Sequence, residues 1–260
     1  ETGGVAATLT LSNVETSGIK VNRSLRLTSN DNLQLNNIEV VAGRTLTIEK
    51  GEVVNDGTLT IETNGTGVIN GLVVTADGAN TTVALEGAVL AGSQINGQTI
   101  SINGSTLRNT TVNAAQINVL SGHELTLQGV VQLNGALITG AGTVAVNGAQ
   151  VFNGIFARPT TVTERAADTV GNQIHNSTFA AVLTASDVVV LAAPVFTDED
   201  VNVNKDITIL GAATFTDDNT VTIASTATIS FGAPIVQAKD TTLTLNGLGG
   251  VEGLGNLGIA

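Results

Sequence analysis

The chain has 260 residues, of which 42% are hydrophobic and 12% are charged, and its formal net charge at pH 7 is −12. This balance argues against a nucleic-acid partner, because phosphate binding needs clustered lysine and arginine residues and the 10 present are spread along the chain. Cysteine is absent, which excludes disulfides, thiolate metal sites and cysteine nucleophiles. No apolar run approaches the length of a transmembrane helix, so the sequence predicts no membrane insertion.

The composition predicts an extracellular protein at the cell surface. Bacterial and archaeal surface proteins commonly lack cysteine, which avoids mispairing of thiols during export. The chain begins with Glu1 and not with methionine, and such an end is typical of a processed chain. We therefore expect the protein to work outside the cell.

Aliphatic and threonine residues alternate in short segments along the whole chain. Alternation with a period of two places the aliphatic side chains on one face of a strand and threonine on the other, and β-branched residues favour this setting. The sequence therefore predicts an all-β fold of short strands. The clearest alternating segments are residues 8–11, 25–27, 46–48, 59–61, 100–102, 125–127, 144–146, 207–209, 221–223 and 243–245.

Asn-Gly pairs stand between many of these segments and predict tight corners. Asn and Gly tolerate the positive φ angles that such corners need. Asn-Gly is also the strongest two-residue hairpin signal, so these pairs alone fit an antiparallel meander as well as a parallel coil. The pairs that directly follow a hydrophobic residue are Asn70-Gly71, Asn96-Gly97, Asn103-Gly104, Asn134-Gly135, Asn147-Gly148, Asn153-Gly154 and Asn246-Gly247.

An internal repeat near the C-terminus favours the parallel coil. Residues 191–196, 210–215 and 231–236 align without gaps at spacings of 19 and 21, and an alternating segment follows each of them. A unit of about 20 residues with short strands and small-residue corners is the size of one coil of a β-solenoid, which buries its inner face only by stacking on its neighbours. The sequence therefore predicts a single-stranded parallel β-helix with coils of about 20 residues.

Four phenylalanines have spacings close to one coil and predict a stacked column in the core. Phe179, Phe196, Phe215 and Phe231 follow one another at spacings of 17, 19 and 16. Residues at the same position of successive coils lie above one another, so these rings should stack. Ordinary core filling without a column is the alternative.

Composition divides the chain into four parts. Residues 1–157 are rich in Asn-Gly and predict a first set of solenoid coils, whereas residues 158–178 alternate weakly, carry mixed charge and predict an insertion or loop. Residues 179–245 predict further coils that contain phenylalanine. Residues 246–260 predict an apolar C-terminal tail rich in Gly and Leu, which we interpret as a subunit contact.

With its aliphatic-Thr-aliphatic strands, Asn-Gly corners and repeat of about 20 residues, the chain resembles the right-handed parallel β-helix surface proteins. This group includes passenger domains of bacterial autotransporters, filamentous-haemagglutinin-like adhesins, phage tailspikes and pectate-lyase-like enzymes. The resemblance covers most of the chain. It implies a right-handed coil and a surface role, either as an adhesin or as a subunit of an extracellular filament.

The sequence gives little indication of a catalytic or metal-binding site. The chain has no Trp or Tyr, and the polysaccharide-cleaving members of the group it resembles typically bind sugars through aromatic residues. Stacked coils would place Asp198 over Asp217, and such a pair fits a capped turn, a calcium site or an acid pair for glycoside hydrolysis. We favour the capped turn, so we assign no catalytic, cofactor-binding or metal-binding residue and predict that the chain is not an enzyme. His123 and His175 are isolated, and we expect both to be exposed loop residues.

Sequons for N-glycosylation are present along the chain. They would lie on the surface if they carry glycans. In a chain rich in Asn and Thr such triplets also arise by chance, so both interpretations remain open. The sequons begin at Asn22, Asn64, Asn80, Asn103, Asn109 and Asn176.

The ends of the predicted solenoid suggest assembly. A solenoid exposes unpaired backbone at its ends, which natural solenoids cover with polar or helical caps. No amphipathic cap helix is predicted here, and Glu252 is the only charged residue from Leu245 onwards. We therefore predict head-to-tail self-assembly into a filament, sheath or other surface structure, with the chain itself as partner and no cofactor. The alternatives are an adhesin stalk or passenger domain of a larger surface protein, with cell-surface glycans as partner, and, ranked below it, a polysaccharide-active enzyme or a phage tailspike.

Overall fold

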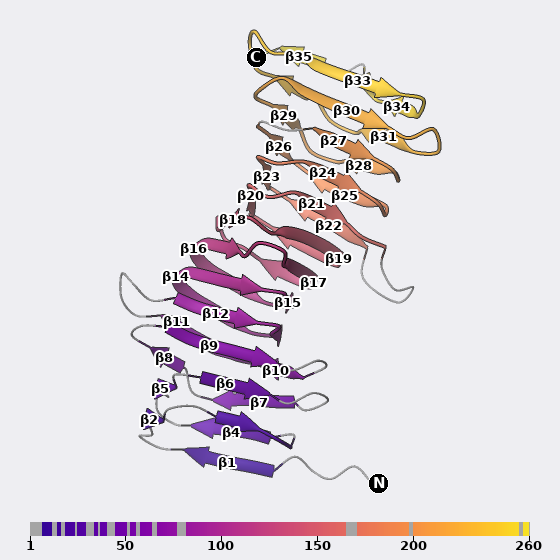
Figure 1. Cartoon of the computed structure of the whole chain (residues 1–260). Helices are drawn as coiled ribbons and strands as arrows, with labels where there is room; N and C mark the ends of the chain where they lie inside the picture. Colours follow the sequence, from indigo (N-terminus) through magenta and orange to yellow (C-terminus); the bar gives the residue numbers. More distant parts are fainter. Residues whose placement is uncertain are drawn as a thin grey trace.

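The computed structural model of the chain describes residues 7–259 apart from residues 12–14, 17–18, 24, 30–33, 36, 41–44, 51–52, 56–57, 64–66, 77–81, 165–170, 198–199 and 255–256. Its strands pair in parallel and stack into a β-solenoid with about 20 residues per coil, which confirms the all-β class and the parallel β-helix. The coil is of the right-handed type. The coils follow one another in chain order from the N-terminus at the bottom of Figure 1 to the C-terminus at the top. Within the described residues no helix has the length and hydropathy needed to cross a bilayer.

The coils build three faces, and strands of one face pair in parallel from coil to coil, except that β2 (Glu15–Thr16) and β5 (Gln34–Leu35) form a separate two-stranded sheet. Four long strands turn a corner, so that their two halves lie on neighbouring faces: β14 (Gln94–Asn103), β16 (Thr111–Val119), β17 (Glu124–Gln132) and β19 (Thr143–Phe152). The first face contains β1 (Ala7–Leu11), β4 (Leu25–Ser29), β7 (Thr45–Lys50), β10 (Val68–Asn70), β13 (Val89–Ala91), β15 (Ser105–Arg108), the starts of β17 and β19, β21 (Thr160–Val162), β24 (Leu183–Ala185), β27 (Val201–Val203), β30 (Asn219–Ile223) and β33 (Leu243–Gly247).

The other two faces follow the same order along the chain. The second face contains β2 (Glu15–Thr16), β5 (Gln34–Leu35), β8 (Val53–Asn55), β11 (Val73–Ala76), the starts of β14 and β16, the ends of β17 and β19, β22 (Asn172–His175), β25 (Val189–Ala192), β28 (Ile207–Ile209), β31 (Thr228–Phe231) and β34 (Gly250–Glu252). The third face contains β3 (Ile19–Val21), β6 (Asn37–Val40), β9 (Thr58–Thr63), β12 (Thr82–Glu86), the ends of β14 and β16, β18 (Leu137–Gly140), β20 (Ile155–Phe156), β23 (Thr178–Phe179), β26 (Val195–Phe196), β29 (Ala213–Phe215), β32 (Ile235–Gln237) and β35 (Leu257–Ile259).

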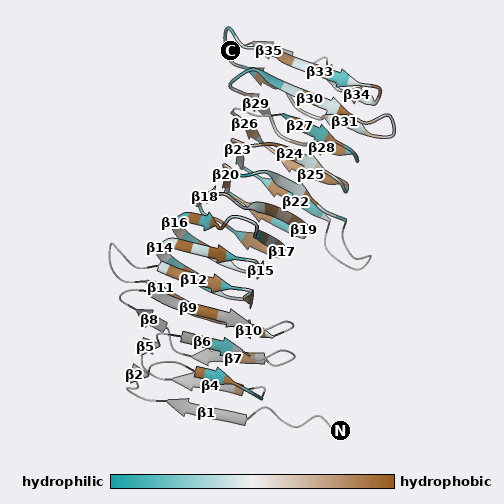
Figure 2. Cartoon of the chain, viewed as in Figure 1, coloured by the Kyte–Doolittle hydropathy of each residue, from teal (hydrophilic) through white to brown (hydrophobic). Residues whose placement is uncertain are grey.

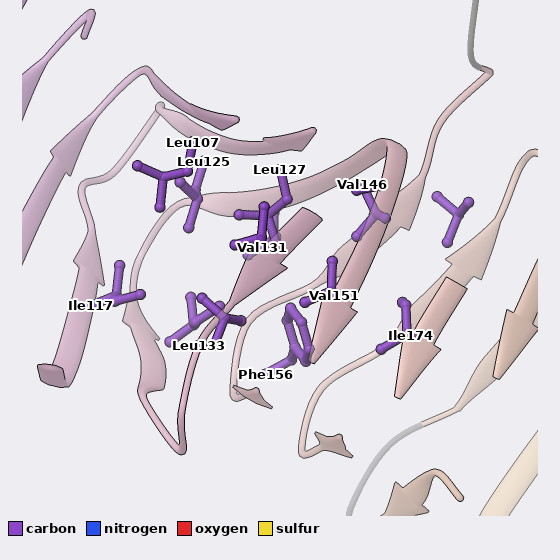
Figure 3. Close-up of a cluster of buried hydrophobic side chains, with 14 of the residues drawn as sticks. Leu107, Ile117, Leu125, Leu127, Val131, Leu133, Val146, Val151, Phe156 and Ile174 are labelled. Carbon is purple, nitrogen blue, oxygen red and sulfur yellow. The ribbon is translucent and has the colours of Figure 1, made fainter. Parts of the chain in front are cut away.

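The alternating pattern produces the core, because aliphatic residues stack on aliphatic residues along the solenoid. On the third face Val83, Ile100, Ile117 and Ile138 pair in this order through four coils, and all four are fully buried. Figure 3 shows how side chains from all three faces point into this single core. Figure 2 shows hydrophobic and hydrophilic residues together on strands such as β14, as expected when only one side of a strand faces the core. Burying one such side chain contributes about 1.5–3 kcal/mol.

A phenylalanine column continues the aliphatic column of the third face. Phe156, Phe179, Phe196 and Phe215 stack with successive ring centroids 5.2, 5.4 and 4.9 Å apart and ring planes within 18° of parallel. The prediction of a column is confirmed for three of its members, but it missed Phe156 and wrongly included Phe231.

Phe231 lies on a different face because it follows Phe215 by less than one coil. It ends β31 and pairs with Ile209, whereas the residue above Phe215 is Gln237. Coil length varies along the chain, since the step from Val83 to its partner Ile100 is shorter than the step from Phe156 to its partner Phe179. The step from Phe215 to Phe231 is shorter than either of these, so Phe231 falls short of the next coil.

The predicted repeat is correct in kind and off by one residue in part of its register. Phe196 pairs with Phe215, as the gapless alignment requires, but Leu191 pairs with Ile209 and not with Leu210. The cause is the corner between the second and third faces. It has two residues between β25 and β26 and three between β28 and β29, so no gapless alignment fits both sides of it.

Two of the predicted segments contain strands that the sequence did not predict. Residues 158–178, predicted as an insertion or loop, contain β21 and β22 and the first residue of β23, which pair in register with neighbouring coils. Thr160, Val162 and Ile174 are buried there, so this segment helps to form the core despite its weak alternation. Residues 246–260 are likewise more than a tail, because β34 and β35 pair with β31 and β32 and continue the stack.

Small polar residues at the corners join successive coils. Ser93, Ser105 and Ser177 are buried, and the hydroxyl oxygen of each accepts a hydrogen bond from a backbone N–H of the preceding coil. Positive φ angles occur at Asn134 (48°) and at Gly148 (59°), as predicted for Asn-Gly corners. The hydrogen bonds to the three serine hydroxyls stabilise the fold, because a buried N–H without an acceptor costs free energy.

Replacing Ser105 by alanine should lower the free energy of unfolding by about 1–3 kcal/mol, the cost of leaving a buried donor unsatisfied. Ser105 Oγ accepts the N–H of Ala88 at 3.1 Å and donates to the carbonyl of Leu85 at 2.9 Å. Denaturant unfolding followed by far-UV circular dichroism measures the loss. Ser101→Ala, in the half-buried outer row of β14, is the matched control and should change the stability by less than about 0.5 kcal/mol. Equal stability of the two variants would contradict the assigned role of Ser105.

Candidate assembly surface

The acidic corner between the third and first faces holds backbone groups in place. Asp200 Oδ1 accepts the N–H of Thr220 at 3.0 Å, and Asp218 Oδ1 accepts the N–H of Thr242 at 2.6 Å, in each case from the next coil. Asp217 Oδ1 accepts the N–H of Asp218 at 2.8 Å. These three aspartates are exposed. In each bond a carboxylate satisfies a backbone donor: two of the bonds cap donors of the next coil, and the third lies within the turn.

The predicted pair of Asp198 and Asp217 lies outside the described residues, because Asp198 belongs to an undescribed segment. Across the described part of the chain, no group of three or more His, Asp and Glu side chains is arranged to hold a metal ion. The corner therefore offers no described ligand set for calcium, which takes six to eight oxygen ligands.

Asp218→Ala should destabilise the chain by about 1 kcal/mol, because the alanine side chain cannot accept the Thr242 N–H. Asp218→Asn keeps an oxygen acceptor of the same shape and should retain most of the stability. Thermal unfolding with and without calcium measures both variants. A calcium-dependent rise in Tm of the unmodified chain that Asp218→Asn abolishes would contradict a capping role.

The two histidines differ in their surroundings. His123 is exposed at a turn, where its N–H donates to the carbonyl of Leu120, as expected of a loop residue. His175 was wrongly expected in a loop: it lies in β22, is half-buried and stacks on Phe152 with ring centroids 4.5 Å apart. Its Nε2 lies 3.2 Å from Oε1 of Gln173. The weak alternation of residues 158–178 concealed this strand.

A column of asparagines on the second face was not found from the sequence. Asn113 Nδ2 donates to Asn96 Oδ1 at 2.7 Å, and Asn134 Nδ2 donates to Asn113 Oδ1 at 2.6 Å. Side-chain amides in parallel register both donate and accept, so the three coils that carry Asn96, Asn113 and Asn134 are linked. The available signal was an Asn that recurs at about one coil's spacing, but from the sequence we interpreted Asn96 and Asn134 as corner residues and did not single out Asn113.

Glycines of the last coil allow it to lie close to the coil below. A Cβ at Gly247 would collide with the carbonyl oxygen of Ile223, and a Cβ at Gly253 would collide with that of Phe231. Both glycines have positive φ angles, 113° and 80°. The glycine-rich C-terminal sequence therefore fits a closely stacked coil.

The last coil leaves one edge open. β33, β34 and β35 pair with β30, β31 and β32 below them, and no described strand pairs with their upper edge, at the top of Figure 1. Leu245 and Val251 are only half-buried, whereas Val221 and Ile229, which occupy the same positions one coil below, are fully buried. Leu248, at the corner of this coil, is 88% exposed. This edge thus combines strands that no described strand covers with half-buried and exposed apolar side chains, and it is the candidate functional surface of the described residues.

The protein thus combines a continuous parallel β-solenoid with an open apolar coil edge and, among its described residues, no metal-binding cluster. Comparison with protein-family models, curated proteins and solved structures gives no match.

Proposed function

We propose that this protein is an extracellular structural protein that assembles end to end through its terminal coils into a filament, sheath or other surface structure. The observation that carries the proposal is the open edge of β33, β34 and β35. An exposed strand edge is a template for pairing with a further strand, and the half-buried Leu245 and Val251 would be buried by one more coil.

The order of strands at the two ends supports head-to-tail pairing. β1, β2 and β3 form the first described coil and lie on the first, second and third faces, in the same order as β33, β34 and β35. A second copy stacked on the last coil would therefore continue each face with its own first strand. Such a heterologous contact does not close on itself, so it generates a filament and not a dimer.

The surface chemistry of the last coil fits this contact. Glu252 is the only charged residue between Leu243 and Ala260, so pairing buries few charges, whose desolvation would oppose it. The absence of cysteine and the low charge content support an extracellular setting, in which the protein needs no reducing environment.

Electron microscopy of the purified protein over a series of concentrations tests the proposal. We expect rods that lengthen with concentration, with no ligand added. Discrete particles of one solenoid length at every concentration would contradict self-assembly. They would support the alternative of a stalk or passenger domain of a larger surface protein, for which the stack of described coils is suited as a rigid spacer. Glycan-binding measurements would follow.

A further inference from the structure

Asn246 differs from four inner Asn-Gly pairs, those of Asn70, Asn134, Asn147 and Asn153, in the hydrogen bond of the following glycine. Gly247 N–H donates to Oδ1 of Asn246 itself at 2.8 Å, and both residues are exposed. At four inner pairs the corresponding N–H donates to a neighbouring coil. Gly71 N–H bonds to the carbonyl of Ala91 at 2.9 Å, and Gly135 N–H bonds to that of Asn153 at 2.7 Å.

Two further inner pairs use side-chain acceptors of the next coil. Gly148 N–H donates to Asn172 Oδ1 at 2.8 Å, and Gly154 N–H donates to Ser177 Oγ at 3.1 Å. Both acceptors belong to buried residues, 2% and 1% exposed. In these coils the glycine nitrogen is therefore held toward the next coil and away from the preceding asparagine side chain.

We propose that Asn246 is a site of spontaneous deamidation, which the open edge of the last coil leaves unprotected. The backbone nitrogen of Gly247 loses its proton to hydroxide and attacks Cγ of Asn246, and the bond from Cγ to Nδ2 breaks with release of ammonia. The product is a five-membered succinimide. Addition of water to either of its carbonyls opens the ring and yields aspartate or isoaspartate. The net reaction consumes one water and releases one ammonia, and it needs no other reactant.

The geometry favours this reaction at Asn246 because the reacting groups already touch. The bond from Gly247 N–H to Asn246 Oδ1 places the nitrogen beside the side-chain amide, and such proximity lowers the entropic part of the barrier. Glycine adds no side chain that would shield the nitrogen. At Asn153, by contrast, the bond from Gly154 to Ser177 must open before the nitrogen can turn toward the side chain.

The modification would change the last coil. Aspartate adds a negative charge beside an edge whose only charged residue is Glu252. Isoaspartate also adds a carbon atom to the backbone of β33, which shifts Gly247 out of register with Ile223. The proposal itself does not depend on assembly, since it concerns the free edge of a single molecule.

Mass spectrometry of digested peptides tests the proposal on the full-length protein, incubated at neutral pH and at a dilution where it is monomeric. We expect Asn246 to convert at least about tenfold faster than Asn70, Asn134, Asn147 and Asn153, since each of those requires a local opening first. A control incubation in urea should equalise the five rates, because the dipeptide is the same at every site. Conversion of Asn246 no faster than that of the inner sites in the folded protein would overturn the proposal.

Ser177→Ala provides a second, reverse test. The variant lacks the acceptor for Gly154 N–H, so deamidation at Asn153 should accelerate while Asn134 stays slow. Circular dichroism verifies that the variant is folded. If Ser177→Ala unfolds, deamidation accelerates at all sites together. The comparison of Asn246 with the inner sites in the unmodified protein is then the test of the proposal. An unchanged rate at Asn153 in a folded variant would contradict protection by the neighbouring coil.

Discussion

Phe196→Ala is expected to destabilise the solenoid by about 3–5 kcal/mol, the usual cost of removing a buried phenylalanine side chain. Phe196 is 2% exposed and stacks on Phe179 at 5.4 Å and on Phe215 at 4.9 Å. The alanine would leave a cavity in the middle of the column and remove two ring contacts, each worth about 0.5–1.5 kcal/mol. Because the protein has no Trp or Tyr, far-UV circular dichroism in denaturant measures the unfolding.

Phe152→Ala is the matched control for this prediction. Phe152 also stacks on an aromatic ring, that of His175 at 4.5 Å, but it is half-buried on the outside of the second face. Its loss should cost about 1 kcal/mol. Equal destabilisation by the two variants would contradict a central role of the Phe column. In a solenoid the coils interact mainly with their neighbours, so Phe196→Ala should also make the unfolding transition less cooperative.

Leu245→Lys should abolish end-to-end assembly while the protein remains folded. Leu245 faces the core of the last coil but is half-buried, so a lysine there can extend its ammonium group into solvent in the free protein. A coil stacked above would bury that charge without a partner, at a cost of about 3–5 kcal/mol. Such a cost weakens pairing at least about a hundredfold, which sedimentation velocity would detect as loss of the fast-sedimenting species.

Thr244→Lys is the control, because it adds the same charge to the neighbouring position of the same strand. Thr244 is exposed on the outer side of β33, so a lysine there stays in solvent whether or not a coil lies above. We expect Thr244→Lys to assemble like the unmodified protein. If Leu245→Lys assembled to the same extent as the unmodified protein, the open edge of β33, β34 and β35 would not be the assembly contact.

The fold could be predicted because its signals are local and repeated. Strands such as β12 and β30 alternate aliphatic and polar residues, and in a parallel stack that pattern repeats at the same place of every coil. The stacking of Phe196 on Phe215 follows from their spacing, since the two positions lie close to one coil apart in the sequence.

The register could not be predicted because it depends on corner lengths. The corner at residues 210–212 has one residue more than the same corner one coil earlier, so Leu191 pairs with Ile209 and not with Leu210. The coil from Phe215 to its partner Gln237 is longer than the step from Phe215 to Phe231, so Phe231 does not lie in the column. The residues of a corner carry no periodic pattern, so the length of each corner cannot be determined by aligning the sequence repeats.

The candidate surface could be predicted only in outline. The apolar composition after Leu245 indicated a tail that contacts another subunit. The sequence did not show that this segment forms strands, whereas in the structure β34 pairs with β31 and continues the stack. The roles of Asp218 as a cap and of Ser105 as a buried acceptor depend on what lies in the next coil. Such partners are about 20 residues away in sequence and share no motif.

Hydrogen exchange measured by mass spectrometry across a concentration series tests most directly whether the open edge is the assembly contact. We predict that the amide protons of β33, β34 and β35 that do not bond to the coil below exchange rapidly in dilute protein and become protected as concentration rises, while inner coils such as β25 to β27 stay protected throughout. Exchange in the last coil that does not depend on concentration, or protection that arises on an outer face instead, would contradict it.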